Sequence, residues 1–192
     1  MVKYLYTAVA TTGFNVESED IIKMAFLLEE EGNPEVLAKE VFHIKPRKGR
    51  MPKDISKEAL EFNGVTIEGL RKFEDPEITC GDLLGFLRRH SNEDRIIAVS
   101  HNSEFDLSFI DNFIQRYTSY NIKNFIAPTK HIDLISVAPF VEFSSDIKFN
   151  NYKFDTLCEY FNLQHRKESI VSKVVNTRRI CYYFKNKIEK IN

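Results

Sequence analysis

Two short stretches carry the residues whose types and spacing could do chemistry. The first, "YTAVATTGFN", is an apolar strand that runs into a turn at Thr11, Thr12 and Gly13. A metal-dependent active site built on such a strand needs carboxylates at its end, because hard cations such as Mg²⁺ bind carboxylate oxygens. Here those two positions are Ala8 and Ala10, and a methyl group binds no cation.

The second stretch, "SHNSEFDLSFI", contains Asp106, a carboxylate that could bind a metal. One carboxylate does not hold two Mg²⁺ ions, so Asp106 predicts at most a weak metal site. Structural interpretations are open as well: Asp106 could hydrogen-bond the start of its helix. His101 and Asn102 could simply close a strand-to-helix turn.

The elements that must position these residues follow from hydrophobic periodicity. The Gly, Asn and Pro of "EEEGNPE" predict a hairpin between the second and third strands. The expected strands are Val2–Ala10, Ile21–Leu28, Val36–Ile44 and Arg95–Ser100. The expected helices are Ser56–Phe62, Thr66–Phe73, Thr79–His90, Phe154–Phe161 and about Val171–Ile188.

A further helix is predicted over "SEFDLSFIDNFIQRY", with its aromatic residues on one stripe and Ser103 as its N-cap. "HIDLISVA" fits a helix or a strand. Strands first, then helices alternating with strands, predict the α/β class with a mixed sheet covered by helices. The length and composition predict a single domain over residues 1–192.

Composition narrows the functional classes. The net charge of −1 provides no global field toward nucleic acid or membrane. From His165 to Asn192 there are eight Lys and Arg against two Glu, which fits a solvated helix face or a binding surface. Cys80, Cys158 and Cys181 are widely spaced and predict free thiols in a reducing compartment. Without a signal-like or membrane-spanning segment, we expect a cytoplasmic protein with no membrane contact.

The order of these pieces resembles the DEDDh family of 3′–5′ exonucleases, which includes polymerase proofreading subunits and ribonuclease T. "VATTGFN" resembles the first motif, Asp-x-Glu-Thr-Thr-Gly, and "FNGVT" resembles a His-Gly-Ile-Thr element with Asn63 at the His position. "VSHNSEFDLSFI" resembles the second motif, and "IDLISVA" and "YKFDTLCEYFNL" resemble two helical segments. The resemblance covers nearly the whole chain and implies a ribonuclease H-like sheet of about five strands flanked by helices.

The family's third motif is His, four residues and then Asp, on the last helix. The best frame is "SKVVNT", which puts Ser172 at the His position and Thr177 at the Asp position. His165 offers no better frame, because Ile170 would then stand at the Asp position. Thr177 lies on an apolar helical face, where its hydroxyl can bond the carbonyl four residues back.

Family members cleave the terminal phosphodiester with two divalent cations, which four carboxylates hold while a His takes the proton from water. By this resemblance Asp106 is the one group of the five that is present. The other four positions hold Ala8, Ala10, Ser172 and Thr177. The resemblance thus implies a family member that is catalytically inactive as written and needs no cofactor, with Mg²⁺ or Mn²⁺ expected only if it is active.

Such a protein could still bind the 3′ end of single-stranded nucleic acid, DNA or RNA, with the basic last helix contacting phosphates. The residues expected at that interface are Thr11, Thr12, Gly13, Phe14, His101, Asn102 and Phe105.

Two alternatives stay open. The chain could be an altered copy of an active exonuclease, or active through ligands such as Glu17, Glu19, Asp20 or Glu104. It could instead be a scaffold that binds a protein partner. The Ala pair at positions 8 and 10 looks like deliberate carboxylate removal, whereas Ser172 and Thr177 are unusual replacements and favour natural loss.

Overall fold

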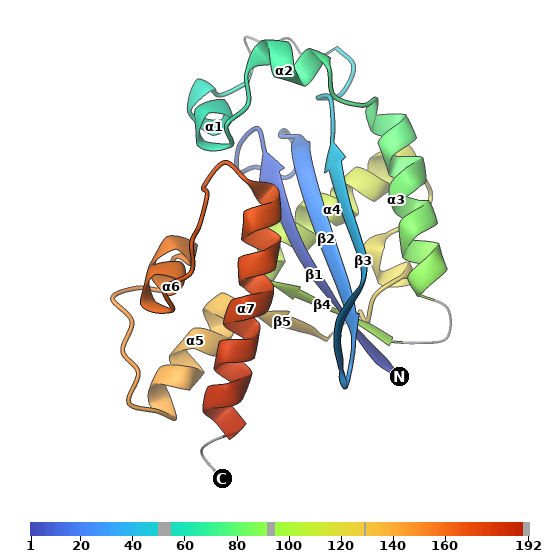
Figure 1. The fold of residues 1–192 in the computed structure, drawn as a ribbon. Coiled ribbons are helices and arrows are strands. Elements are labelled where there is room, and N and C mark those ends of the chain that lie inside the picture. The colour runs from blue at the N-terminus through green and yellow to red at the C-terminus, as the bar shows by residue number, and fades with distance from the viewer. Residues whose placement is uncertain (50–54, 92–94, 129, 190–192) are drawn as a thin grey trace.

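A five-stranded mixed sheet forms the centre of the computed structural model, which describes residues 1–49, 55–91, 95–128 and 130–189 (Figure 1). The strands are β1 (Val2–Thr11), β2 (Ile21–Glu30), β3 (Asn33–His43), β4 (Arg95–Ser100) and β5 (His131–Asp133), in the order β3-β2-β1-β4-β5. β2 pairs antiparallel with β1 and β3, whereas β1 with β4 and β4 with β5 are parallel. The predicted α/β class and the predicted antiparallel start of the sheet are confirmed.

Helices cover both faces of the sheet. They are α1 (Lys57–Phe62), α2 (Ile67–Arg71), α3 (Pro76–His90), α4 (Ser103–Tyr117), α5 (Leu134–Phe143), α6 (Phe154–Tyr160) and α7 (Ile170–Glu189), with a 3-10 turn η2 (Ile122–Asn124). Alternate residues of a strand point to opposite faces. Leu5 and Val9 of β1 therefore pack with α3 and α4, while Ala8 and Ala10 pack with α1, α2 and α7.

The ends of β1 and β4 set the place of the functional residues. Parallel pairing brings the carboxyl ends of both strands to one end of the sheet, where α1 and α2 also lie, and the start of β1 and the end of α7 lie at the other end (Figure 1). "HIDLISVA" forms the short strand β5 and then the start of α5. The N-cap of α4 is Asn102, whose Oδ1 accepts from the N–H of Phe105, and not Ser103 as the sequence predicted. Ser103 instead donates through its N–H and its hydroxyl to Asp133.

A buried carboxylate holds α7 against the sheet. Glu29 of β2 is 2% exposed and accepts from Arg178 Nε at 2.5 Å and from the Tyr182 hydroxyl at 2.9 Å, both on α7. The hydroxyl of Tyr6 donates to the same carboxylate. Breaking such a buried pair leaves an uncompensated charge. This network therefore sets the rotation of α7, and with it which α7 residues face the end of the sheet.

In the part of the chain that the structure describes, no helix is long and apolar enough to cross a membrane.

Candidate functional site

A cleft of about 560 Å³ opens at the end of the sheet where β1 stops. Its lining comes from the end of β1 and the following loop, from α1, from the starts of α4 and α6, and from the segment that leads into α7. Of the residues that the sequence predicted for a nucleic-acid interface, six line this cleft: Thr11, Thr12, Gly13, Phe14, His101 and Phe105. Asn102 caps α4 and lies outside the lining.

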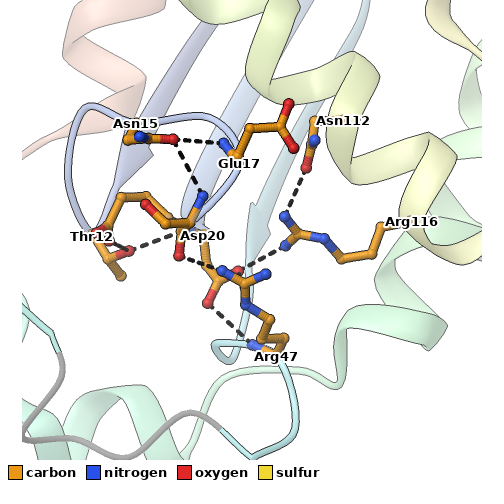
Figure 2. Close-up of polar contacts among 9 residues, drawn as sticks. Thr12, Asn15, Glu17, Asp20, Arg47, Asn112 and Arg116 are labelled. Atoms are coloured by element: carbon orange, nitrogen blue, oxygen red, sulfur yellow. Dashed lines mark hydrogen bonds and ion pairs between the residues drawn. The ribbon is translucent and has the colours of Figure 1, made fainter.

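Asp20 holds the loop between β1 and β2 (Figure 2). It is 4% exposed, and its carboxylate lies 2.8 Å from Arg116 Nη1 and 3.2 Å from Arg47 Nε. Its backbone N–H donates to Thr12 Oγ1, and its carbonyl accepts from the Thr12 N–H, both at 2.9 Å. Because two guanidinium groups already offset its charge, Asp20 is a structural residue and a poor substitute metal ligand.

The same loop presents an aromatic ring to solvent. Phe14 is 92% exposed, and its ring centroid lies 6.3 Å from that of Phe105 at the start of α4. Gly13 lets Glu19 approach the backbone, since a Cβ at position 13 would lie 2.8 Å from the carboxyl carbon of Glu19. Glu19 in turn accepts from the Thr12 hydroxyl at 2.5 Å. The loop is thus ordered from within and leaves Phe14 free to stack on a ligand.

Asp106 lies behind this lining, between β1 and β4. It is 1% exposed and accepts from the Ser100 hydroxyl and from the N–H of Val9 at 3.4 Å. Its carboxylate therefore sits beside the stretch of β1 that carries Ala8 and Ala10. Burial raises the pKa of Asp106, while the ammonium of Lys173 acts in the opposite direction.

Two histidines line the cleft near Asp106. The ring of Phe154 lies between them, with centroid distances of 5.2 Å to His101 and 4.9 Å to His165. His101 Nε2 donates to the carbonyl of Tyr152 at 2.9 Å, and His165 Nε2 lies 3.4 Å from Asp155 Oδ1. Burial lowers the pKa of both imidazoles, which favours their neutral forms. Sequence spacing gave His165 no place in the third motif, but in the structure His165 lines the cleft.

The frame predicted for the third motif is corrected by the structure. Ser172 and Thr177 do not line the cleft. Ser172 Oγ accepts from the N–H of Arg166 at 3.2 Å. Thr177 is fully buried, and its hydroxyl donates to the Lys173 carbonyl at 2.9 Å, the back-bond expected from the sequence. Both hydroxyls are used within α7 and its lead-in.

Glu168 and Lys173 line the cleft instead, with the same spacing four residues earlier. Lys23 fixes this segment, because its Nζ donates to the carbonyls of Glu168 at 3.2 Å and Asn63 at 2.7 Å. Gly64 packs directly below: a Cβ there would lie 2.5 Å from the Cβ of Glu168. The spacing of "ESIVSK" was the one sequence signal that could have found these two residues.

The donor set does not fit a pair of divalent cations. Across the described ranges, no group of three or more His, Cys, Asp or Glu side chains could hold a metal ion. Asp106 lies next to the stretch of β1 whose residues 8 and 10 are alanines, and the positive charge of Lys173 acts on it. Hard cations need several carboxylate oxygens, and a nearby ammonium repels them.

Comparison with known proteins finds relatives among the ribonucleases T. The chain is 32% identical over 111 residues to ribonuclease T of Vibrio parahaemolyticus, with 54% of this chain and 50% of the relative covered. It is 31% identical over 109 residues to ribonuclease T of Haemophilus influenzae, with 53% and 46% covered. The chain thus spans about half the length of the curated relatives that it matches. No family model matches the chain.

Solved structures of exonuclease I share the fold. The complex of Escherichia coli exonuclease I with a dT13 oligonucleotide superposes with a TM-score of 0.78 at 16% identity, over 97% of this chain and 41% of that one. The zinc-bound form of the E. coli exonuclease I–ssDNA complex gives 0.82 at 15% identity, over 100% and 42%. The chain is related to the DEDDh 3′–5′ exonucleases. Its sheet is the ribonuclease H-like sheet of that family.

The raised pKa of Asp106 makes the free energy of unfolding depend on pH. Its folded-state pKa is raised, so the stability that it contributes is full at low pH and is lost as the pH rises through that pKa. Asp106→Asn should therefore raise the free energy of unfolding at pH 8 by roughly 1–2 kcal/mol, the size of one poorly matched buried polar group. The gain should vanish at acid pH. Urea denaturation at several pH values measures both.

Asp82→Asn, at an exposed position of α3, is the matched control and should change little at any pH. A loss of stability in Asp106→Asn at pH 8, or a change that does not depend on pH, would contradict the assignment.

Proposed function

We propose that this protein is an inactive member of the DEDDh lineage that binds the 3′ end of single-stranded nucleic acid in the cleft. One observation carries the proposal. Of the four carboxylates that the family uses, Asp106 alone is present; it lies behind the cleft, next to the stretch of β1 that carries Ala8 and Ala10, and Lys173 lines the cleft. Such a cleft can accommodate a single strand, but it lacks the carboxylates that would bind the metal ions for cleavage.

The cleft lining supports a new assignment of the two third-motif positions. We infer that Glu168 stands at the His position of the third motif and Lys173 at its Asp position, since both line the cleft with the required spacing. The second replacement removes a metal ligand, because an ammonium has no lone pair with which to bind a cation and repels it by charge.

Several features support binding of a strand. Phe14 is exposed at the cleft and stands near Phe105, which makes a platform for a base. The exonuclease I structures of the same fold include complexes with dT13 and with ssDNA. The basic end of α7 does not contribute: Lys185 lies about 18 Å along the helix from Lys173 at 1.5 Å per residue, away from the cleft.

Activity tests the first half of the proposal. With Mg²⁺ or Mn²⁺, the protein should not shorten a 5′-labelled single strand. The variant Ala8→Asp/Ala10→Glu/Glu168→His/Lys173→Asp restores four groups around Asp106 and should recover metal-dependent degradation from the 3′ end. The recovered rate should be at least 10²-fold above background, since the general base alone contributes about that much.

The matched control keeps the first two changes and adds Ser172→His/Thr177→Asp, which lie outside the cleft lining. It should stay inactive. Folding of each variant must be checked by circular dichroism melting, because the new carboxylates at positions 8 and 10 enter an apolar cluster with Ile170 and Val174. The proposal fails if the unaltered protein degrades the strand while its Asp106→Ala variant does not.

Binding tests the second half. Phe14→Ala should weaken binding of a fluorescent single strand about tenfold, the size of one lost base–aromatic stack. Fluorescence anisotropy at low salt measures this. Phe14 is 92% exposed, so its removal leaves the core intact. Phe143→Ala, at an 87% exposed phenylalanine of α5 outside the cleft, should bind like the unaltered protein. Equal affinities for both variants would contradict the stacking role.

A further inference from the structure

Lys173 is a cation of the cleft lining whose charge acts on Asp106, His101 and His165. It lies in the first turns of α7, lines the cleft and is half-buried. Its ammonium favours the ionised form of Asp106 and lowers the pKa of His101 and His165. These three residues come from the starts of α4 and α7, so Lys173 stands among the groups that enclose this end of the cleft.

The backbone holds Lys173 in this place. Its N–H donates to the Ser169 carbonyl at 3.0 Å, and its own carbonyl accepts from the Thr177 hydroxyl. The buried pair of Glu29 with Arg178 fixes the rotation of the helix. The backbone thus fixes the position from which Lys173 lines the cleft.

The other lysine of the cleft lining is already engaged, since Lys167 Nζ lies 2.7 Å from Asp155 Oδ2. Lys23, outside the lining, donates through Nζ to the backbone carbonyls of Asn63 and Glu168. Two carboxylates of the lining accept hydrogen bonds from hydroxyls: Glu19 accepts from Thr12, and Glu58 accepts from Ser56 at 2.7 Å. Lys173 takes part in none of the ion pairs formed by residues 1–49, 55–91, 95–128 and 130–189.

An ammonium group can replace one part of what cations do in a cleavage site. It attracts a phosphate oxygen as a point charge, but it neither activates water nor clamps two oxygens at once. It also opposes entry of a divalent cation beside Asp106 through like-charge repulsion. A positive charge that attracts phosphate but does not catalyse cleavage fits a site that retains a single strand.

We propose that Lys173 binds a backbone phosphate of the single strand at the place where active relatives bind their cations, which makes binding independent of metal. This inference rests on the proposed function. It explains why the replacement at this position is a cation, whereas the replacements on β1 are methyl groups.

The test measures the affinity of the full chain for 5′-fluorescein-labelled dT13 and U13 by anisotropy, in EDTA and in Mg²⁺. The affinity should be the same in both buffers. Lys173→Gln should weaken binding about tenfold and reduce the slope of log Kd against log salt by about 0.7, the contribution of one phosphate contact. Lys173→Arg keeps the charge and should stay within about threefold of the unaltered protein.

Lys185→Gln is the control, because Lys185 lies on the same helix, 63% exposed and paired with Glu189. It should bind normally. If the unaltered protein binds but requires Mg²⁺, or if Lys173→Gln binds as tightly as Lys185→Gln, the role of Lys173 is overturned while the proposed function stands. If no strand is retained at low salt, both are overturned.

Discussion

The charge balance around one buried carboxylate decides what this cleft can do. Asp106 is held between β1 and β4 by Val9 and Ser100, and the ammonium of Lys173 is the charge that acts on it most strongly. A pair of divalent cations needs several carboxylates at this point. With methyl groups on β1 and a cation on α7, the electrostatics favour a phosphate over a metal.

The rest of the fold keeps this arrangement rigid. Glu29 fixes α7 against the sheet, Asp20 holds the loop after β1, and Lys23 joins the end of α1 to the start of α7. Each of these buried or half-buried polar groups is satisfied by partners from distant parts of the chain. These interactions shape the cleft even though its donor set does not fit a pair of divalent cations.

Much of this structure could be predicted from the sequence, because periodicity and turn residues report local geometry. The boundaries of β4 were predicted to the residue, and those of β1 and α7 to within one or two residues. The third motif could not be framed, since a shift of four residues turns a helix by only about 40° and keeps the same apolar face. Nor could sequence spacing show that Asp20 forms ion pairs with Arg47, which follows β3, and with Arg116 of α4.

The account is tested most directly by a crystal structure of the unaltered protein grown with dT13 and Mn²⁺, with anomalous scattering used to locate manganese. The account predicts no manganese pair beside Asp106 and a backbone phosphate within hydrogen-bond distance of the Lys173 ammonium. Two manganese ions about 4 Å apart beside Asp106, with Lys173 turned out of the cleft, would contradict it.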